Sequence, residues 1–121
     1  MQKYFFDSYA IVEIIKGNPN YAKYIQEEIT ITIFNLVEIY WSAINYLGEK
    51  EESEIYDRYR FGVVDVEDSI LKEAIKFRKE NKKKDLSYTD CIGYVYALKN
   101  NFIFLTWDSQ FNGMKDVEFV K

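Results

Sequence analysis

The sequence predicts the α/β fold class, with a three-layer α/β/α architecture around a mostly parallel central sheet. Short apolar runs alternate with segments of helical periodicity, and the runs are apolar on both faces, as in parallel strands covered by helices on two sides. Of the 121 residues, 48% are hydrophobic and 18% aromatic, enough to build a core. Because no Gly-, Ser- or Pro-rich linker divides the chain, we expect a single domain over residues 1–121.

Five apolar runs are predicted to be strands. The run at 4–6 ends at Asp7, and the run at 29–34 is β-branched up to its final aromatic residue. The other three runs are short, as expected for strands that are buried on both faces. The predicted strands are residues 4–6, 29–34, 62–66, 102–105 and 117–119.

The segments between these runs have helical periodicity. Apolar residues recur with helical spacing after Asp7, and the Gly-Asn-Pro at 17–19 ends that helix and begins the next. Gly48 ends the helix that follows the second strand, and a charged helix comes after it. The predicted helices are residues 10–15, 20–26, 36–47, 49–59, 68–81 and 87–99, with a short turn or helix after the fourth strand.

The composition excludes several kinds of catalytic site. Because the chain has no histidine, it cannot contain a Ser-His-Asp triad, a Cys-His dyad or a histidine-ligated zinc ion. The single cysteine, Cys91, excludes an internal disulfide and a four-cysteine metal cluster, and it fits a reducing compartment. Any bound metal is therefore expected to be a hard, oxygen-binding cation such as Mg²⁺ or Mn²⁺.

We expect a cytoplasmic protein that does not enter a membrane. Asp7 and Glu13 interrupt the apolar N-terminal stretch, and no window approaches the roughly 18 uncharged apolar residues of a spanning helix. The chain has 20 acidic and 16 basic residues, which gives a net charge of −4. Binding of nucleic acid would therefore need a local basic cluster or a bound cation.

Four acidic residues are expected at one edge of the sheet. Asp7 directly follows the first strand, Asp108 lies just beyond the 102–105 strand, and Glu38 and Asp90 lie in the first turns of two helices. In a parallel α/β unit these positions face the same edge, where ligands gather. Crowded carboxylates raise one another's pKa unless a cation neutralises them, so the edge is a candidate Mg²⁺ or Mn²⁺ site. Such a site most readily supports phosphodiester hydrolysis.

Each of these acids, taken alone, also has a structural explanation. The segments Asn35–Glu38 and Ser87–Asp90 resemble capping boxes. Asp7 and Asp108 could be N-caps, each contributing about 1 kcal/mol to stability. Capping explains a single acid more easily than it explains four acids at one edge.

Four short motifs together resemble the PIN-domain family. They are Tyr4-Phe-Phe-Asp7-Ser8, Asn35-Leu-Val-Glu38, Leu86-Ser-Tyr-Thr-Asp90 and Phe104-Leu-Thr106-Trp-Asp108, in the order and rough spacing of PIN-domain proteins. With the chain length, they resemble the ribonuclease toxins of VapBC toxin–antitoxin pairs over essentially the whole chain. One departure is a glycine that often precedes the helix of the third acid, because Lys82-Lys-Lys-Asp85 stands there instead.

The resemblance implies a metal-dependent endoribonuclease whose products carry a 5′-phosphate and a 3′-hydroxyl. It implies that the four acids described above are the catalytic residues that bind Mg²⁺ or Mn²⁺, and that Ser8 and Thr106 support them. It further implies three partners, namely an RNA substrate, a small VapB-like antitoxin and a second copy of the chain in a homodimer. The 11 tyrosines and nine phenylalanines exceed what the core needs, so some are expected at such interfaces.

The main basic cluster lies immediately before the helix of Asp90 and contains Lys82, Lys83 and Lys84. Lysines near a helix C-terminus complement the helix dipole, so these could be a solvated helix end. Clustered lysines are equally typical of contacts to a nucleic-acid backbone, and the two interpretations stay open here.

Other functions fit the sequence less well or compete with the ribonuclease hypothesis. A phosphoryl-transfer domain would need a second acid two residues after Asp7, where Tyr9 stands, and a receiver-like domain would need a late lysine. The serious alternative is a catalytically inactive PIN-like scaffold that only binds proteins. Retention of all four acids speaks against that alternative.

Overall fold

A sheet of three parallel strands runs through the computed structural model, which describes residues 2–121. Residue 1 of the predicted 1–121 domain lies outside the described residues. Phe5 pairs with Phe104, and Leu105 pairs with Glu118, so β2 is the central strand. The strands are β1 (Tyr4–Phe6), β2 (Ile103–Thr106) and β3 (Val117–Phe119), close to the first, fourth and fifth predicted strands.

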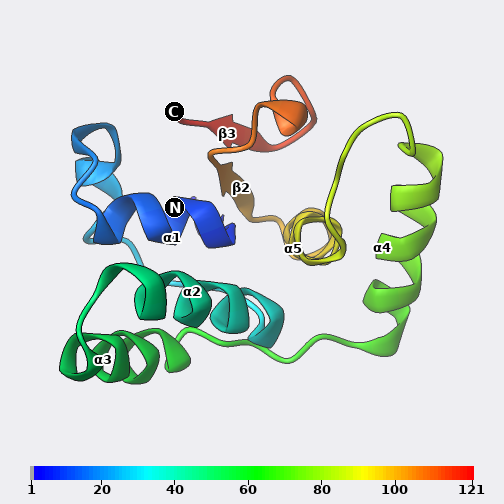
Figure 1. Ribbon diagram of the computed structural model, residues 1–121. Coiled ribbons are helices and arrows are strands. Elements are labelled where there is room, and N and C mark those ends of the chain that lie inside the picture. Colours follow the sequence, from blue (N-terminus) through cyan, green and yellow to red (C-terminus); the bar gives the residue numbers. More distant parts are fainter. Residues whose placement is uncertain (1) are drawn as a thin grey trace.

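Helices connect and cover these strands (Figure 1). They are α1 (Ser8–Ile15), the 3₁₀ helix η1 (Pro19–Tyr24), α2 (Ile33–Tyr46), α3 (Glu49–Arg60), α4 (Asp68–Glu80), α5 (Tyr88–Lys99) and the 3₁₀ helix η2 (Ser109–Phe111). Each predicted helix is present, with ends displaced by a few residues. Within residues 2–121, every helix falls short of the length and apolar content needed to cross a membrane.

The core has two parts, one on each face of the sheet. Phe6 and Leu105 pack on one face with buried residues of α1, α2 and α3. Their strand neighbours Phe5 and Phe104 point to the opposite face and pack with buried residues of α4 and α5. In Figure 1, α4 and α5 accordingly lie on one side of the strands, and α1, α2 and α3 lie on the other. The predicted three-layer α/β/α architecture is thereby confirmed.

The predicted strands at 29–34 and 62–66 are wrong in extent. Ile31 and Val63 form only an isolated parallel bridge, and the backbone N–H of Phe6 donates to the carbonyl of Thr30 at 3.0 Å. The β-branched run is cut short because α2 begins inside it. Thr32 is the N-cap of α2 and forms a capping box with Asn35, one turn before the box predicted at 35–38.

α5 lies very close to the sheet at Gly93. A methyl group added at this position would lie 2.6 Å from Cε1 of Phe5, closer than non-bonded carbon atoms approach. Glycine therefore allows the helix to pack directly on β1 and β2.

Candidate functional site

Asp7 lies at the junction of β1 and α1 and is fully buried. It is the N-cap of α1, and its Oδ1 accepts a hydrogen bond from the backbone N–H of Ala10 at 2.6 Å. Its Oδ2 accepts a hydrogen bond from the hydroxyl of Thr106. The predicted N-cap is confirmed, and a capping role leaves the second carboxylate oxygen directed at the end of β2.

Thr106, the last residue of β2, connects Asp7 with Asp108. Its hydroxyl oxygen accepts a hydrogen bond from the backbone N–H of Asp108 at 2.9 Å, in addition to donating to Asp7. Asp108 is the N-cap of η2, and its Oδ1 accepts from the N–H of Gln110 at 2.9 Å. The position predicted to support the metal site therefore contacts two of the four acids.

Glu38 lies in the second turn of α2, not in the first turn as predicted, because α2 begins at Ile33, and its side chain is held by a residue of α1. The hydroxyl of Ser8 donates to Oε1 of Glu38 at 2.6 Å, and Nδ2 of Asn35 donates to Ser8 at 3.0 Å. Asn35 is fully buried and is the residue that our sequence reasoning missed, since we took it only for a helix cap. The short spacing to Glu38 on the same helix was the one available signal that Asn35 lies near the site.

Asp90 lies in the first turn of α5 and is 7% exposed. Its backbone N–H donates to the hydroxyl of Ser87, the N-cap of the helix, at 3.0 Å. Ser87 therefore caps α5 as predicted. The Asp90 side chain lies beside a helix N-terminus, which favours negative charge.

The electrostatics of the site link Asp90 to the other three acids. Burial, and then the negative charges of Asp7, Glu38 and Asp108, raise the pKa of Asp90 to about 8, although a hydrogen bond from Ser87 lowers it. Burial chiefly, with a contribution from Asp108, also raises the pKa of Asp7 to about 7, although its hydrogen bonds oppose the shift. Although Asp7 and Asp108 are 101 residues apart in sequence, the charges of Asp7, Glu38 and Asp108 all contribute to the raised pKa of Asp90.

The chemistry of these residues fits a divalent cation, although they do not form a preformed metal site. The donor set is all oxygen, which suits Mg²⁺ or Mn²⁺, and neither buried acid forms a salt bridge with a described residue. Within residues 2–121, however, no group of three or more acidic or cysteine side chains is arranged so that it could hold a metal ion. Glu38 and Asp108 are partly buried, and each carboxylate accepts a hydrogen bond, from Ser8 and from Gln110 respectively.

The predicted basic cluster lies near Asp108, because Lys84 of the cluster contacts Gln110. Nζ of Lys84 donates to the carbonyl oxygen of Gln110 at 2.9 Å, and the backbone N–H of Asp85 donates to the Gln110 side chain, also at 2.9 Å. Lys82 and Lys83 are exposed in the same turn. The cluster therefore lies next to η2, which begins directly after Asp108.

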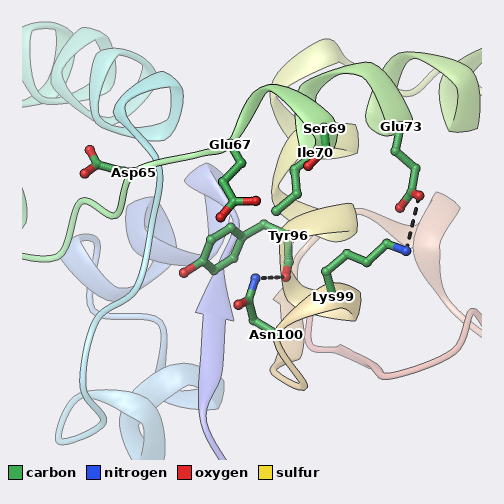
Figure 2. A pocket seen from close by; sticks show the side chains of 8 residues that line it. All are labelled: Asp65, Glu67, Ser69, Ile70, Glu73, Tyr96, Lys99 and Asn100. Atoms are coloured by element: carbon green, nitrogen blue, oxygen red, sulfur yellow. Dashed lines mark hydrogen bonds and ion pairs between the residues drawn. The ribbon is translucent and has the colours of Figure 1, made fainter.

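A pocket of about 440 Å³ opens at the far end of α5 (Figure 2). Figure 2 shows Glu67 and Glu73 of the α4 region facing Tyr96 and Lys99 of α5, with an ion pair of 3.2 Å between Lys99 and Glu73. None of the four clustered acids lines this pocket. Asp90 and Lys99 stand at opposite ends of a 12-residue helix, so the pocket is separate from the acidic cluster.

Comparisons with known proteins identify the fold. A sequence model of the PIN domain matches residues 4–117. Among solved structures, a chain of a toxin–antitoxin complex from Klebsiella pneumoniae has 17% identity and a TM-score of 0.74, with 96% of both chains covered. A chain of VapBC2 from Rickettsia felis, solved with a promoter DNA fragment, has 15% identity and a TM-score of 0.75, covering 99% of this chain and 100% of that one.

A chain of FitAcB from Neisseria gonorrhoeae has 14% identity and a TM-score of 0.63, with 88% of each chain covered. No curated protein sequence matches at a significant level. At these identities the structural likenesses establish a shared fold, while the family match rests on the sequence itself.

Proposed function

Because the chain belongs to the PIN domain family, we propose that it is a metal-dependent endoribonuclease and the toxin of a VapBC-type toxin–antitoxin pair. A single domain over residues 1–121 would carry this activity in the cytoplasm. The observation that supports the proposal most directly is that Asp90 is buried beside three other acids: burial first, and then the charges of those acids, raise its pKa. Capping a helix needs only one acid, so capping alone does not explain why three other acids lie near Asp90.

We propose that Asp7, Glu38, Asp90 and Asp108 bind Mg²⁺ or Mn²⁺. When bound, the cation would polarise the phosphodiester and lower the pKa of an attacking water. Asp7 would be the fixed ligand, because hydrogen bonds from Ala10 and Thr106 hold both of its oxygens in place. Glu38 and Asp108, which are partly buried, would complete the site.

The neighbouring side chains would orient these acids. Ser8 holds Glu38 by its hydroxyl, and Asn35 in turn holds Ser8, so the orientation of Glu38 depends on two buried polar residues. Thr106 orients Asp7 in the same way, by donating a hydrogen bond from its hydroxyl. Fixed orientation matters because misplacing a reacting group by about 1 Å can lower the rate about 100-fold.

RNA would reach this site across the turn that contains Lys82, Lys83 and Lys84. The turn lies beside η2 and presents positive charge next to Asp108, on a chain whose net charge is −4. Lysine contacts to flanking phosphates would therefore offset the repulsion between RNA and the acidic protein.

The proposed partners are a VapB-like antitoxin and a second copy of the chain. The matched chains from Klebsiella pneumoniae and Rickettsia felis come from toxin–antitoxin assemblies. This chain also exposes large apolar side chains, among them Trp41 (66% exposed), Val37 (64%) and Phe61 (94%). Aromatic residues exposed in this way are enriched at protein interfaces.

The decisive experiment is cleavage of single-stranded RNA with Mg²⁺ or Mn²⁺, repeated with EDTA. Asp7→Asn should abolish cleavage while keeping the N-cap of α1, because asparagine caps helices about as well as aspartate. Asp57→Asn, which changes an exposed acid of α3, is the matched control and should cleave normally.

The competing proposal is a catalytically inactive scaffold that binds only proteins. It would be favoured if the purified wild-type protein lacked metal-dependent nuclease activity and still bound a partner tightly. Equal activity of wild type and Asp7→Asn would likewise contradict the proposed site.

A further inference from the structure

A small aromatic pocket adjoins the acidic cluster. It has a volume of about 170 Å³, and its walls include Tyr9, Tyr46 and Trp107. Tyr9 and Trp107 lie with ring centroids 6.3 Å apart and ring planes inclined at 41°. Pockets that hold whole small molecules usually measure about 300–1,000 Å³, so this one suits a single planar ring.

The pocket is tied to the acids by chain position. Tyr9 follows Asp7 and Ser8 in the first turn of α1, and Trp107 stands between Thr106 and Asp108. The hydrogen bond from Thr106 to Asp7 therefore fixes the backbone on which both aromatic residues stand. A substrate phosphodiester at the acids would have its neighbouring nucleoside at this pocket.

Two lysines supply positive charge at the aromatic walls. Nζ of Lys16 lies 4.4 Å from the ring centroid of Tyr46, and Nζ of Lys121 lies 4.6 Å from that of Trp107. Neither lysine forms a salt bridge with any described residue. Glu13 also lines the pocket, but its Oε1 already accepts a hydrogen bond from Asn18 at 2.9 Å.

We propose that this pocket binds one unpaired nucleobase next to the scissile phosphate, with Tyr9 and Trp107 stacking on the base and Lys16 and Lys121 contacting the flanking phosphates. The proposal rests on the ribonuclease function above and adds where the substrate is held. Aromatic rings stack on any base, while lysines follow the backbone, and this combination is typical of single-stranded RNA sites. Tyr9 is 53% exposed, so its ring is available for stacking.

The first test compares cleavage of single-stranded RNA by the whole protein and its variants. Trp107→Ala and Tyr9→Ala should each lower kcat/KM by roughly 10- to 100-fold, since stacking is lost. Trp107→Phe and Tyr9→Phe retain an aromatic ring, so they should keep most of the wild-type kcat/KM. Tyr56→Ala removes an exposed tyrosine of α3 that does not line the pocket, and it should cleave normally.

The second test measures binding without catalysis. In the Asp7→Asn/Trp41→Phe protein, Trp107 is the only tryptophan. A short single-stranded oligoribonucleotide should quench its fluorescence, and an abasic oligonucleotide with the same number of phosphates should not. Quenching by both, or by neither, would overturn the base pocket.

The two tests separate this proposal from the one on which it rests. Base-dependent quenching in the Asp7→Asn/Trp41→Phe protein, together with a wild type that cuts no RNA, would support the pocket and contradict the nuclease. Normal cleavage by Trp107→Ala and Tyr9→Ala would overturn the pocket and leave the nuclease standing. If these variants kept RNA cleavage and lost binding of a partner protein, the surface would be a protein-docking site, and the base pocket would again be overturned.

Discussion

The hydroxyl of Thr106 donates a hydrogen bond to Asp7 across 99 positions of the sequence, joining the end of β2 to the start of α1. The same hydroxyl oxygen accepts the backbone N–H of Asp108 at 2.9 Å. One buried side chain thus places two acids of the candidate site. Without it, Asp7 would lose a hydrogen bond that opposes the rise of its pKa.

Replacing Thr106 by valine should therefore affect both stability and the acidic cluster. Thr106→Val keeps the shape of the side chain but leaves a buried acceptor on Asp7 without its donor, which should cost about 1–3 kcal/mol. It should also raise the pKa of Asp7 further. Urea unfolding measures the first effect, and titration of the labelled carboxyl by NMR measures the second.

Thr106→Ser is the matched control for this prediction, because it keeps the hydroxyl and loses only a methyl group. A loss of stability in Thr106→Ser together with little or none in Thr106→Val would mean that packing, rather than the hydrogen bond, is what the residue contributes.

In the absence of divalent cations, the protein should lose stability as the pH rises from about 4 to about 8. In this range the folded protein keeps protons on Asp7 and Asp90, whose pKa values are raised to about 7 and about 8, while the unfolded chain has released them. Stability falls wherever the folded state binds more protons than the unfolded state, by up to about 1.4 kcal/mol per pH unit and proton. Thermal unfolding in EDTA across this range gives the slope.

Asp90→Asn tests the assignment of this pH dependence. The variant has no charge to bury, so its stability in EDTA should fall less steeply with pH than that of the wild type, and it should be the more stable protein at pH 8. Asp57→Asn, on the exposed surface of α3, should keep the wild-type slope. Parallel curves for all three proteins would contradict the prediction.

The sequence was sufficient for the three paired strands and for the order of the helices. Phe5 and Phe104 alternate with Phe6 and Leu105 between the two halves of the core, so each strand is apolar on both faces. Strand ends and the starts of the following helices face one edge of a parallel sheet, which is why the sequence also predicts a site there.

The second predicted strand, at residues 29–34, shows why some features of the fold and of the site could not be predicted. The β-branched residues before Phe34 favour a strand, yet the hydrogen bonds between Thr32 and Asn35 start a helix within the run. Local propensity for strands is weak and depends on neighbours, so a cap outweighs it. The contact of Asn35 with Ser8 spans 27 positions, and no local pattern encodes it.

Saturating Mn²⁺ should raise the melting temperature of the wild-type protein. A ligand at 100 times its Kd stabilises the folded state by about 2.7 kcal/mol, and neutralising the charge around Asp90 provides the physical cause. Asp90→Asn should lose most of the gain, whereas Asp57→Asn should keep it. An unchanged melting temperature of the wild type would contradict a cation site at this edge.

Gly93→Ala should destabilise the protein, although alanine is normally the better helix former by about 1 kcal/mol. The added methyl group would lie 2.6 Å from Cε1 of Phe5, and crowding of this kind in a packed core costs about 1–3 kcal/mol. Phe5→Leu in the Gly93→Ala background should recover part of the loss, because the shorter side chain makes room, although it lowers stability when made alone. Urea unfolding of the two single variants and the double variant measures this coupling, and strictly additive losses would mean that α5 does not meet β1 at Gly93.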